Sequence, residues 1–377
     1  MNALFLYNPK DLHAPINGGV QLCSQEFLEI LKHTCSTLHF FEVEFSKSIA
    51  FKLLFKLKLD NYLFYDTERY EPELLQYIDR NKITHVYINK SELLRFSKVI
   101  KNGLTNPPKV IIMSHGNESG DLLGDLTTPD LTGFIRGFLG KIKLGFNLYT
   151  ESMYRKRYVD MVCVMSEEEA SLEKWLGINE VLVIPRIVSQ NDVQHSVRDR
   201  NIFGFVGTLD HGPNQTALKL LFAQLKKVNF SGKVEIVGGP KEAGARLAYQ
   251  YDFVTYLGKL DEIALNKAMS TWGFFINPIF FYSRGASMKL AKAIESETPT
   301  ITTKAGQRGY LWKVDRHLLV TKNNVFDFTE KMCECLQPEF KYEQAISDVI
   351  EIKTSGLSPQ ELGEELKERS LNLIVKD

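Results

Sequence analysis

The chain has 377 residues, which predicts two or three domains, and its 46 lysines and arginines balance 46 acidic residues. Zero net charge excludes a nucleic-acid binder that works by bulk positive charge, and 44% hydrophobic residues exclude a disordered chain. No apolar run approaches the ~20 residues of a membrane span. The N-terminus is typical of a first strand rather than of a signal peptide. The five cysteines lack the spacing of metal ligands. We therefore expect a cytoplasmic protein without a nucleic-acid partner.

Apolar runs and segments of helical periodicity alternate along the first half of the chain. A polar stretch over 189–200 has no apolar periodicity and is predicted to be a linker. We predict buried strands at 3–7, 84–88, 110–113, 161–165 and 181–184, and helices over 20–33 and 91–101.

The same alternation restarts after the linker and ends in a helix predicted over 360–374. Such alternation on both sides of a linker indicates two doubly wound α/β domains with parallel sheets. Their ligands are expected at the carboxyl ends of the strands, in a cleft between the domains. We predict strands at 202–206, 234–237, 254–257, 274–276 and 300–302 and helices over 214–226 and from 289. The predicted domains are 1–188 and 201–356, and 189–200 is the linker between them. Residues 357–377 are predicted to form a C-terminal helix that packs back toward the first domain.

Two loops of the first domain carry candidate binding residues. Gly18 and Gly19 precede a helix, where paired glycines let a ligand approach the backbone and the free amides attract a phosphate; a plain tight turn is the alternative. His115 directly follows a predicted strand and can hydrogen-bond a hydroxyl or accept a proton, although most lone histidines are structural. Asn117 and Glu118 come directly after this loop and are candidates for contact with the acceptor. Glu118 is equally well explained as an inert loop residue.

A third loop opens the second domain. Gly207 follows a strand, and Thr208 and His211 offer hydrogen-bond donors to a ligand. Asn214 is predicted to cap the following helix, so a capped strand-to-helix loop is the plain alternative.

The fourth loop is the densest in cations. Arg284 and Lys289 flank Gly285 and other small residues at the start of a predicted helix. Two cations beside helix amides form a clamp suited to a diphosphate, although a charge run is more often a solvated face.

The order of these motifs resembles the glycosyltransferases of the GT-B fold, in particular the large retaining family 4. The resemblance covers some 300 residues, and its most specific part is a subfamily pattern "RG…K…EA…g.PvVtT..g..G". The matching residues are Gly18-Gly19-Val20, His115, Ser166 to Ala170, Ile184-Pro185, Phe205 to Gly207, Pro213-Asn214, Gly258 to Asp261, Arg284-Gly285, Lys289, Pro299, Thr302-Thr303, Gly306 and Gly309.

Two departures from the family bear on the donor site. By register, Lys292 stands where relatives carry a glutamate that binds the ribose hydroxyls, and an ammonium group has no acceptor atom. Lys292 therefore adds to the diphosphate clamp, marks an altered donor site or marks a lost one, and Glu295 one helical turn away is a substitute acid. Many relatives carry basic residues at the start of the second domain, and these are missing here. Positive charge at that position is therefore left to His211.

The resemblance implies sugar transfer from a nucleotide-diphosphate donor to a glycan or lipid-linked glycan acceptor, with retention of configuration, in bacterial surface polysaccharide or glycoconjugate synthesis. It implies that Gly18, Gly19, Arg284, Gly285 and Lys289 bind the diphosphate and that His115 contacts the transferred sugar or the acceptor. No Asp-x-Asp signature is present, so neither a metal nor a cofactor is expected. Base selection is expected near 238–240 and 256–258. The alternatives are a non-catalytic GT-B subunit or binding protein with a degenerate donor site and, with less support, a sugar-phosphate epimerase of the same architecture.

Two segments mix lysines with apolar residues, 45–60 and 133–146. Such segments can lie on an anionic bilayer, as a lipid-linked acceptor would require, so peripheral contact with the inner face of a membrane is a hypothesis. In 51–59 the odd positions are all apolar, which is strand periodicity and favours a core element there.

Overall fold

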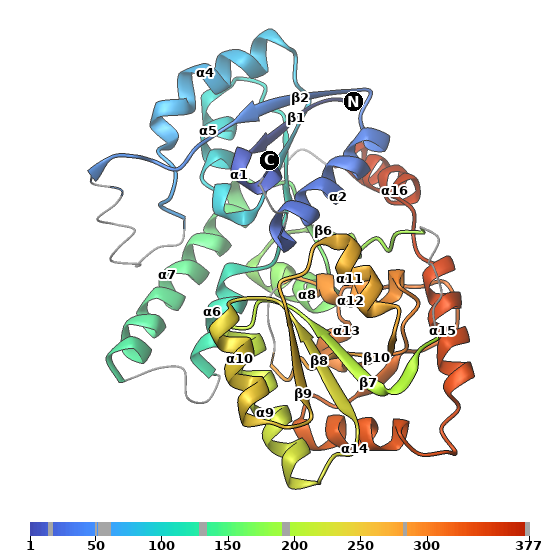
Figure 1. Cartoon of the computed structure of the whole chain (residues 1–377). Helices are drawn as coiled ribbons and strands as arrows, with labels where there is room; N and C mark the ends of the chain where they lie inside the picture. Colours follow the sequence, from blue (N-terminus) through green and yellow to red (C-terminus); the bar gives the residue numbers. More distant parts are fainter. Residues whose placement is uncertain are drawn as a thin grey trace. The chain divides into compact units, whose positions relative to one another are not determined.

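The computed structural model describes residues 1–13, 18–49, 51, 62–127, 134–190, 197–281 and 285–373. The chain forms two compact units. The first comprises Met1–Pro185, Ser283–Gly285 and Ser358–Asp377, and the second comprises Arg186–Tyr282 and Ala286–Leu357 (Figure 1).

The first unit is built on a six-stranded parallel sheet in the order β2-β1-β3-β4-β5-β6. Its central strands are continuous apolar runs, buried on both faces by the helices that cover a parallel sheet. The strands are β1 (Asn2–Tyr7), β2 (Thr37–Glu42), β3 (His85–Asn89), β4 (Lys109–Met113), β5 (Met161–Val164) and β6 (Glu180–Val183), and the helices are α1 (Pro9–Leu12), α2 (Gly19–Thr34), α4 (Thr67–Arg80), η1 (Ser91–Leu93), α5 (Phe96–Gly103), α6 (Glu118–Thr127), α7 (Phe134–Arg157), α8 (Glu167–Leu176) and α16 (Pro359–Leu371).

The C-terminal helix α16 belongs to the first unit and lies beside α2 (Figure 1). Gly363 sits at the crossing, because a Cβ atom there would come within 2.6 Å of His33 Cβ. Thr34 Oγ1 donates to the Gly363 carbonyl at 3.1 Å, and the Ser370 hydroxyl contacts Tyr87 Oη at 3.0 Å. The last helix is thus fixed to the sheet by both close packing and buried hydrogen bonds.

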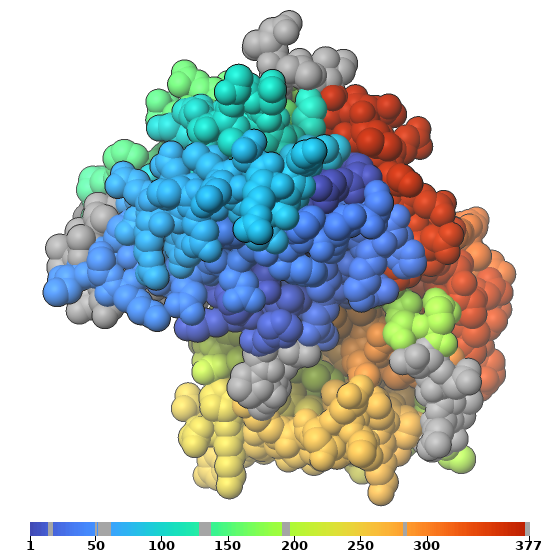
Figure 2. Space-filling view, turned by 90° about the horizontal axis from the view of Figure 1, so that it is seen from above, coloured from blue at the N-terminus to red at the C-terminus, as the bar shows by residue number. Residues whose placement is uncertain are grey.

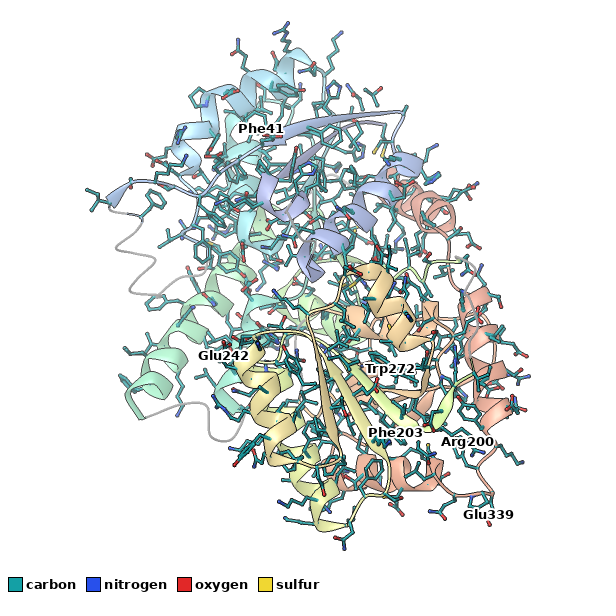
Figure 3. All side chains as sticks on the ribbon, viewed as in Figure 1. Phe41, Arg200, Phe203, Glu242, Trp272 and Glu339 are labelled. Atoms are coloured by element: carbon teal, nitrogen blue, oxygen red, sulfur yellow. The ribbon has the colours of Figure 1, made fainter. Side chains whose placement is uncertain are left out.

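The second unit has a second parallel sheet in the order β12-β11-β10-β7-β8-β9. Phe203 and Trp272 lie on its neighbouring strands β7 and β10 (Figure 3). The Trp272 ring packs where a side chain on Gly204 would otherwise stand, and its Nε1 donates to Glu235 at 2.7 Å. The strands are β7 (Asp199–Val206), β8 (Lys233–Val237), β9 (Val254–Gly258), β10 (Trp272–Asn277), β11 (Thr300–Thr303) and β12 (Leu319–Thr321), and the helices are α9 (Gly212–Lys227), α10 (Lys241–Gln250), α11 (Glu262–Met269), α12 (Met288–Glu295), α13 (Lys304–Gln307), α14 (Val325–Cys335) and α15 (Tyr342–Thr354).

The prediction of two doubly wound parallel α/β sheets is confirmed, with corrections at edges. The edge strands β2 and β12 were not predicted, because polar residues interrupt the apolar run in β2 and β12 has three residues; the edge strands β6 and β9 were predicted. The predicted linker extended two residues too far, since β7 begins at Asp199, which pairs with Trp272. The helix predicted over 91–101 is two elements, because hydrogen bonds of the i→i+3 type at Leu94 and Ser97 form a tighter turn first.

None of the described helices is long and apolar enough to cross a membrane.

Candidate functional site

The carboxyl ends of strands β7, β8, β9 and β10 bring the candidate residues of the second unit together. In the strand order, chain succession reverses between β7 and β10, which are neighbours although β8 and β9 lie between them in sequence. Ligands of open parallel sheets bind outside the carboxyl edge at such a switch point. Gly207 follows β7 and Asn277 ends β10, so both lie at this position.

The loops after β7 and β8 are in direct backbone contact. Gly238 has φ +142°, and a Cβ atom there would lie 1.8 Å from the Gly207 carbonyl oxygen. The Leu209 N–H donates to the Gly239 carbonyl at 2.6 Å. Glycine at position 238 is therefore required by both backbone conformation and space.

Lys289 is held at the same edge by a polar and an aromatic contact. Its ammonium donates to Asn214 Oδ1 at 2.6 Å and lies 5.0 Å from the centre of the Phe205 ring. Asn214 Nδ2 in turn donates to the Thr208 carbonyl at 2.8 Å. Burial lowers the pKa of Lys289 to about 8, because desolvation disfavours the charged form. The arrangement holds a poorly solvated cation beside the glycine loop.

Asn214 was predicted to cap α9, and this prediction is wrong. The helix begins earlier, with His211 as the N-cap residue and Pro213 in its first turn, a position that proline favours because its ring presets φ. The Asn214 amide is thereby left to join Thr208 to Lys289, as described above. His211 itself is exposed.

A cavity of about 590 Å³ opens at the carboxyl ends of β8 and β9. Tyr256 forms one wall, and its hydroxyl donates to the Gly238 carbonyl at 2.8 Å, which fixes the ring against the β8 loop. Two lysines, Lys241 and Lys259, also border the space. The full lining is Gly239, Pro240, Lys241, Tyr256, Leu257, Gly258 and Lys259.

Lys292 forms ion pairs with two carboxylates. Its ammonium lies 3.6 Å from Glu295 of the same helix and 3.8 Å from Glu262 of α11. The two candidates Lys292 and Glu295 are thus neighbours, and the ammonium there is accompanied by acids rather than by other cations. Arg284 lies outside the described residues.

In the first unit, His115 follows β4 at the carboxyl edge of the sheet. Its Nε2 contacts Asn89 Oδ1 at 2.9 Å, and its ring packs edge-on against Phe27 with 5.4 Å between centres. Asn89 Nδ2 donates to Ser24 Oγ at 2.9 Å. Because an amide oxygen can only accept, Nε2 carries the proton, and this ring edge is fixed in place.

The glycine pair lies at the start of α2. Gly18 is the N-cap residue, and its N–H donates to Gln21 Oε1 at 3.0 Å, while Gly19 is the first helical residue. One backbone N–H of this N-terminus is therefore already bound by the Gln21 side chain. Asn17 lies outside the described residues.

Asn117 and Glu118 differ in their surroundings. Asn117 is buried, donates to Glu173 Oε1 at 3.0 Å and accepts from the Gly120 N–H at 2.8 Å, so its side chain holds the start of α6. Glu173 also binds Arg155 through two hydrogen bonds at 2.7 and 2.9 Å. Glu118 is half-buried at the first position of α6.

Gly285 is counted with the first unit and lies against the backbone of His115. Its N–H donates to Glu169 Oε1 at 2.8 Å. At φ +66° a Cβ atom on Gly285 would come within 2.9 Å of the His115 carbonyl oxygen. Two predicted site residues, far apart in sequence, are therefore brought together.

Several residues of these two edges were not singled out from the sequence. Asn89 and Asn277 each end a strand, and Asn277 Nδ2 donates to Thr302 Oγ1 at 3.1 Å while its Oδ1 accepts from Ser287 at 3.2 Å. A buried asparagine at the carboxyl end of a predicted strand was the available signal. In the ranges that the structure covers, no group of three His, Cys, Asp or Glu side chains is placed to hold a metal ion.

Comparison with known proteins assigns the fold. Residues 200–338 match a family model described as glycosyl transferases group 1. The chain is similar to the lipopolysaccharide outer core galactosyltransferase WaaB in its apo form, with a TM-score of 0.64 and 12% identity over 99% of this chain and 100% of that one. It is also similar to HepE from Anabaena in complex with UDP and glucose, with a TM-score of 0.61 and 12% identity over 99% and 100% of the two chains.

The chain spans only part of another matched structure, that of TarM. It covers 54% of the TarM chain with 79% of its own, at 13% identity and a TM-score of 0.48. Comparison of the sequence with curated proteins gives no match. The two six-stranded parallel sheets and the likeness to WaaB and HepE show the GT-B fold.

Proposed function

We propose that this chain is a glycosyltransferase that moves a sugar from a nucleotide-diphosphate donor to a glycan or lipid-linked glycan acceptor. The observation that carries the proposal is the carboxyl edge of the second sheet, where Lys289 and the loops of Gly207 and Gly238 lie together. This edge falls within residues 200–338, which match glycosyl transferases group 1.

The donor is assigned to the second unit. The cavity beside Tyr256 has a volume typical of small-molecule sites and offers an aromatic wall to a nucleoside. Lys289 lies in the first turn of α12, so a diphosphate there would meet both an ammonium group and the positive end of a helix. HepE, which shares the fold, was solved in complex with UDP and glucose, and this supports a uridine donor as the first candidate.

Charge stabilisation supplies the chemistry in this proposal. The bond between the sugar and the diphosphate breaks, and negative charge develops on the leaving phosphate oxygen. A preorganised cation and backbone donors stabilise that charge more strongly than water does, because they do not have to reorganise. We assign Lys289 to this role. The family resemblance, rather than the geometry, adds Arg284 and Gly285 as diphosphate ligands and His115 as a contact of the transferred sugar or the acceptor. We also propose that the reaction needs no metal, so EDTA should leave donor binding unchanged.

Finer assignments rest on the family resemblance. Membership of family 4, retention of anomeric configuration and a role in bacterial surface polysaccharide or glycoconjugate synthesis are proposals on that basis. Retention is tested directly by following the anomeric proton of the product by NMR.

Calorimetric titration with UDP, GDP, dTDP and CMP tests the function. We expect one nucleotide to bind the native chain and Lys289→Ala to bind it at least tenfold more weakly, since a hydrogen bond to a charged group contributes about 1.5–3 kcal/mol. Lys219→Ala, an exposed lysine of α9, is the matched control and should bind like the native chain. Equal binding by both variants would contradict the assignment of Lys289.

Failure of every nucleotide to bind would favour the second candidate, a GT-B subunit that has lost its donor site. Lys292 is the observation that favours it, because its ion pairs with Glu262 and Glu295 occupy the helix face where relatives carry an unpaired acid for the ribose. Lys292→Glu should then restore no nucleotide binding, whereas in an active enzyme with an altered site it should change the preferred nucleotide or its affinity.

A further inference from the structure

Helix α7 carries large apolar side chains on its exposed face. Five of them are exposed by 38 to 70%: Phe138, Leu139, Ile142, Phe146 and Tyr149. In helical geometry, residues 138, 142, 146 and 149 fall within one stripe of about 80°. With each aromatic contributing about half of its ~200 Å², the stripe approaches the size at which an exposed apolar patch marks an interaction site.

The opposite face of the same helix carries buried polar side chains beside the buried ring of Tyr154. Glu151 accepts from the Tyr62 hydroxyl and from the Ser119 N–H at 3.2 Å, and Arg155 is fully buried in its ion pair with Glu173. Helices of globular proteins ordinarily place apolar residues inward and polar residues outward. Here large apolar residues also face outward, and the buried ion pair of Arg155 and the hydrogen bonds of Glu151 fix which face of α7 is turned outward.

Lysines border the apolar stripe. Lys141 lies about 60° from Phe138 on one side, and Lys143 lies beyond Leu139 on the other. The sequence from 134 to 150 contains no aspartate or glutamate. Asp121 and Asp125 lie on α6, a helix that packs on α7 and adds the exposed side chain of Leu123.

We propose that this apolar stripe docks on an anionic lipid bilayer, with the stripe at the level of the acyl chains and the exposed Lys141 at the headgroups. An apolar face with basic borders and no acid of its own complements a surface that is negative outside and apolar within. A second copy of the chain fits this face less well, because a twofold interface would bring the lysines of both copies together. The green atoms of α7 lie at the surface in the space-filling view (Figure 2).

Co-sedimentation of the full chain with sucrose-loaded vesicles tests the proposal. We expect binding to vesicles of phosphatidylcholine with 40% phosphatidylglycerol and little binding to phosphatidylcholine alone. Phe138→Ser combined with Phe146→Ser should weaken the binding at least about tenfold. Lys141→Glu should weaken it by at least roughly fivefold, since each surface charge near an anionic leaflet contributes about that factor.

Matched controls come from the second unit. Phe326 on α14 is exposed by 66%, comparable with the 60% of Phe138, and Lys219 on α9 is exposed. Phe326→Ser and Lys219→Glu should bind vesicles like the native chain. Because every altered side chain points to solvent, thermal unfolding should stay within about 2 °C for all variants. A separate Phe138→Trp variant should show fluorescence quenching by brominated lipids, which reports contact even if the serine variant unfolds.

Three results would overturn the proposal. They are no binding to anionic vesicles, equal binding to neutral vesicles, or equal weakening by the control variants. Sedimentation velocity without lipid gives a fourth: a native dimer that Phe138→Ser converts to monomer would assign the stripe to a second copy of the chain. None of these measurements involves a nucleotide, so they stand apart from the test of transferase function.

Discussion

The sharpest test of the donor site is the pH dependence of nucleotide binding through Lys289. The perturbation is Lys289→Met, which keeps an unbranched apolar stem of similar reach and removes the charge. In the native chain, burial lowers the pKa of this ammonium from 10.5 to about 8. A diphosphate that binds the charged form would raise the pKa again, so binding and protonation are linked.

The magnitude follows from that pKa. With a value of about 8, Lys289 is about nine-tenths charged at pH 7 and about one-tenth charged at pH 9. If only the ammonium form binds the diphosphate, affinity falls about tenfold between these pH values. The terminal phosphate of UDP has a second pKa of about 6, so it is mostly ionised already at pH 7 and its charge changes little over this range. The methionine variant should bind about 10- to 100-fold more weakly at pH 7 and lose the pH dependence.

Stability should move in the opposite direction. The unfolded chain keeps a proton on this lysine up to about pH 10.5, whereas the folded chain releases it near 8. The unfolded state therefore binds more protons between these values, and native stability rises with pH across that window. At pH 7 the buried ammonium is a cost to folding, so Lys289→Met should keep or raise the midpoint of thermal unfolding while it weakens ligand binding.

Isothermal titration with UDP, or with whichever nucleotide binds, at pH 7 and pH 9 decides the matter. Lys289→Arg keeps its charge at both values and should remove the pH dependence, whereas Lys219→Met on the exposed face of α9 should retain it. The reasoning is refuted if native affinity is the same at both pH values, or if the methionine variant binds within twofold of the native chain.

Three further variants test other parts of the structure. His115→Ala should lower the turnover of the donor sugar about 100-fold and leave the nucleotide dissociation constant within twofold, as a donor-hydrolysis assay and a titration would show; a loss in affinity instead would place His115 at the nucleotide. Gly238→Ala should destabilise the fold by at least about 2 kcal/mol in urea unfolding, because its Cβ would overlap the Gly207 carbonyl; a smaller effect would contradict the contact. Glu173→Ala should cost about 3–5 kcal/mol because it removes the carboxylate from a fully buried ion pair with Arg155, and an unchanged urea midpoint would show that the pair is solvated.

The strands that could be predicted from the sequence are those that contain an apolar run, which include the central strands and also the edge strands β6 and β9. Strand β4 is a run of apolar residues with no polar alternation, which a central parallel strand requires. Strand β2 has only one neighbour, and most of its residues are exposed or half-buried, so its sequence carries histidine, threonine and glutamate among the apolar residues. An apolar run identifies a strand, and the prediction fails where polar residues interrupt that run, as they do in β2.

Side-chain pairs across the site could not be predicted in the same way. Lys289 was recognised from its local context, a cation among small residues before a helix. Its acceptor Asn214 lies 75 positions earlier, and local preference assigned that asparagine to a helix cap. The contact of His115 with Asn89 joins the ends of neighbouring strands, a relation that follows from strand order rather than from spacing.

One buried network connects the loop after His115 with the outward face of α7. Glu173 on α8 accepts from Asn117, which caps α6, and from Arg155 of α7. A rotation of α7 that turned its apolar stripe inward would bring Glu151 and Arg155 into solvent and leave the Glu173 carboxylate buried without its ion-pair partner, which costs several kcal/mol. The network therefore specifies the orientation of α7. Burying these polar groups costs free energy, which a helix with an apolar inner face would avoid. If α7 docks on lipid and His115 contacts the acceptor, the same ion pairs fix the position of the lipid-facing surface relative to the acceptor loop within the first unit.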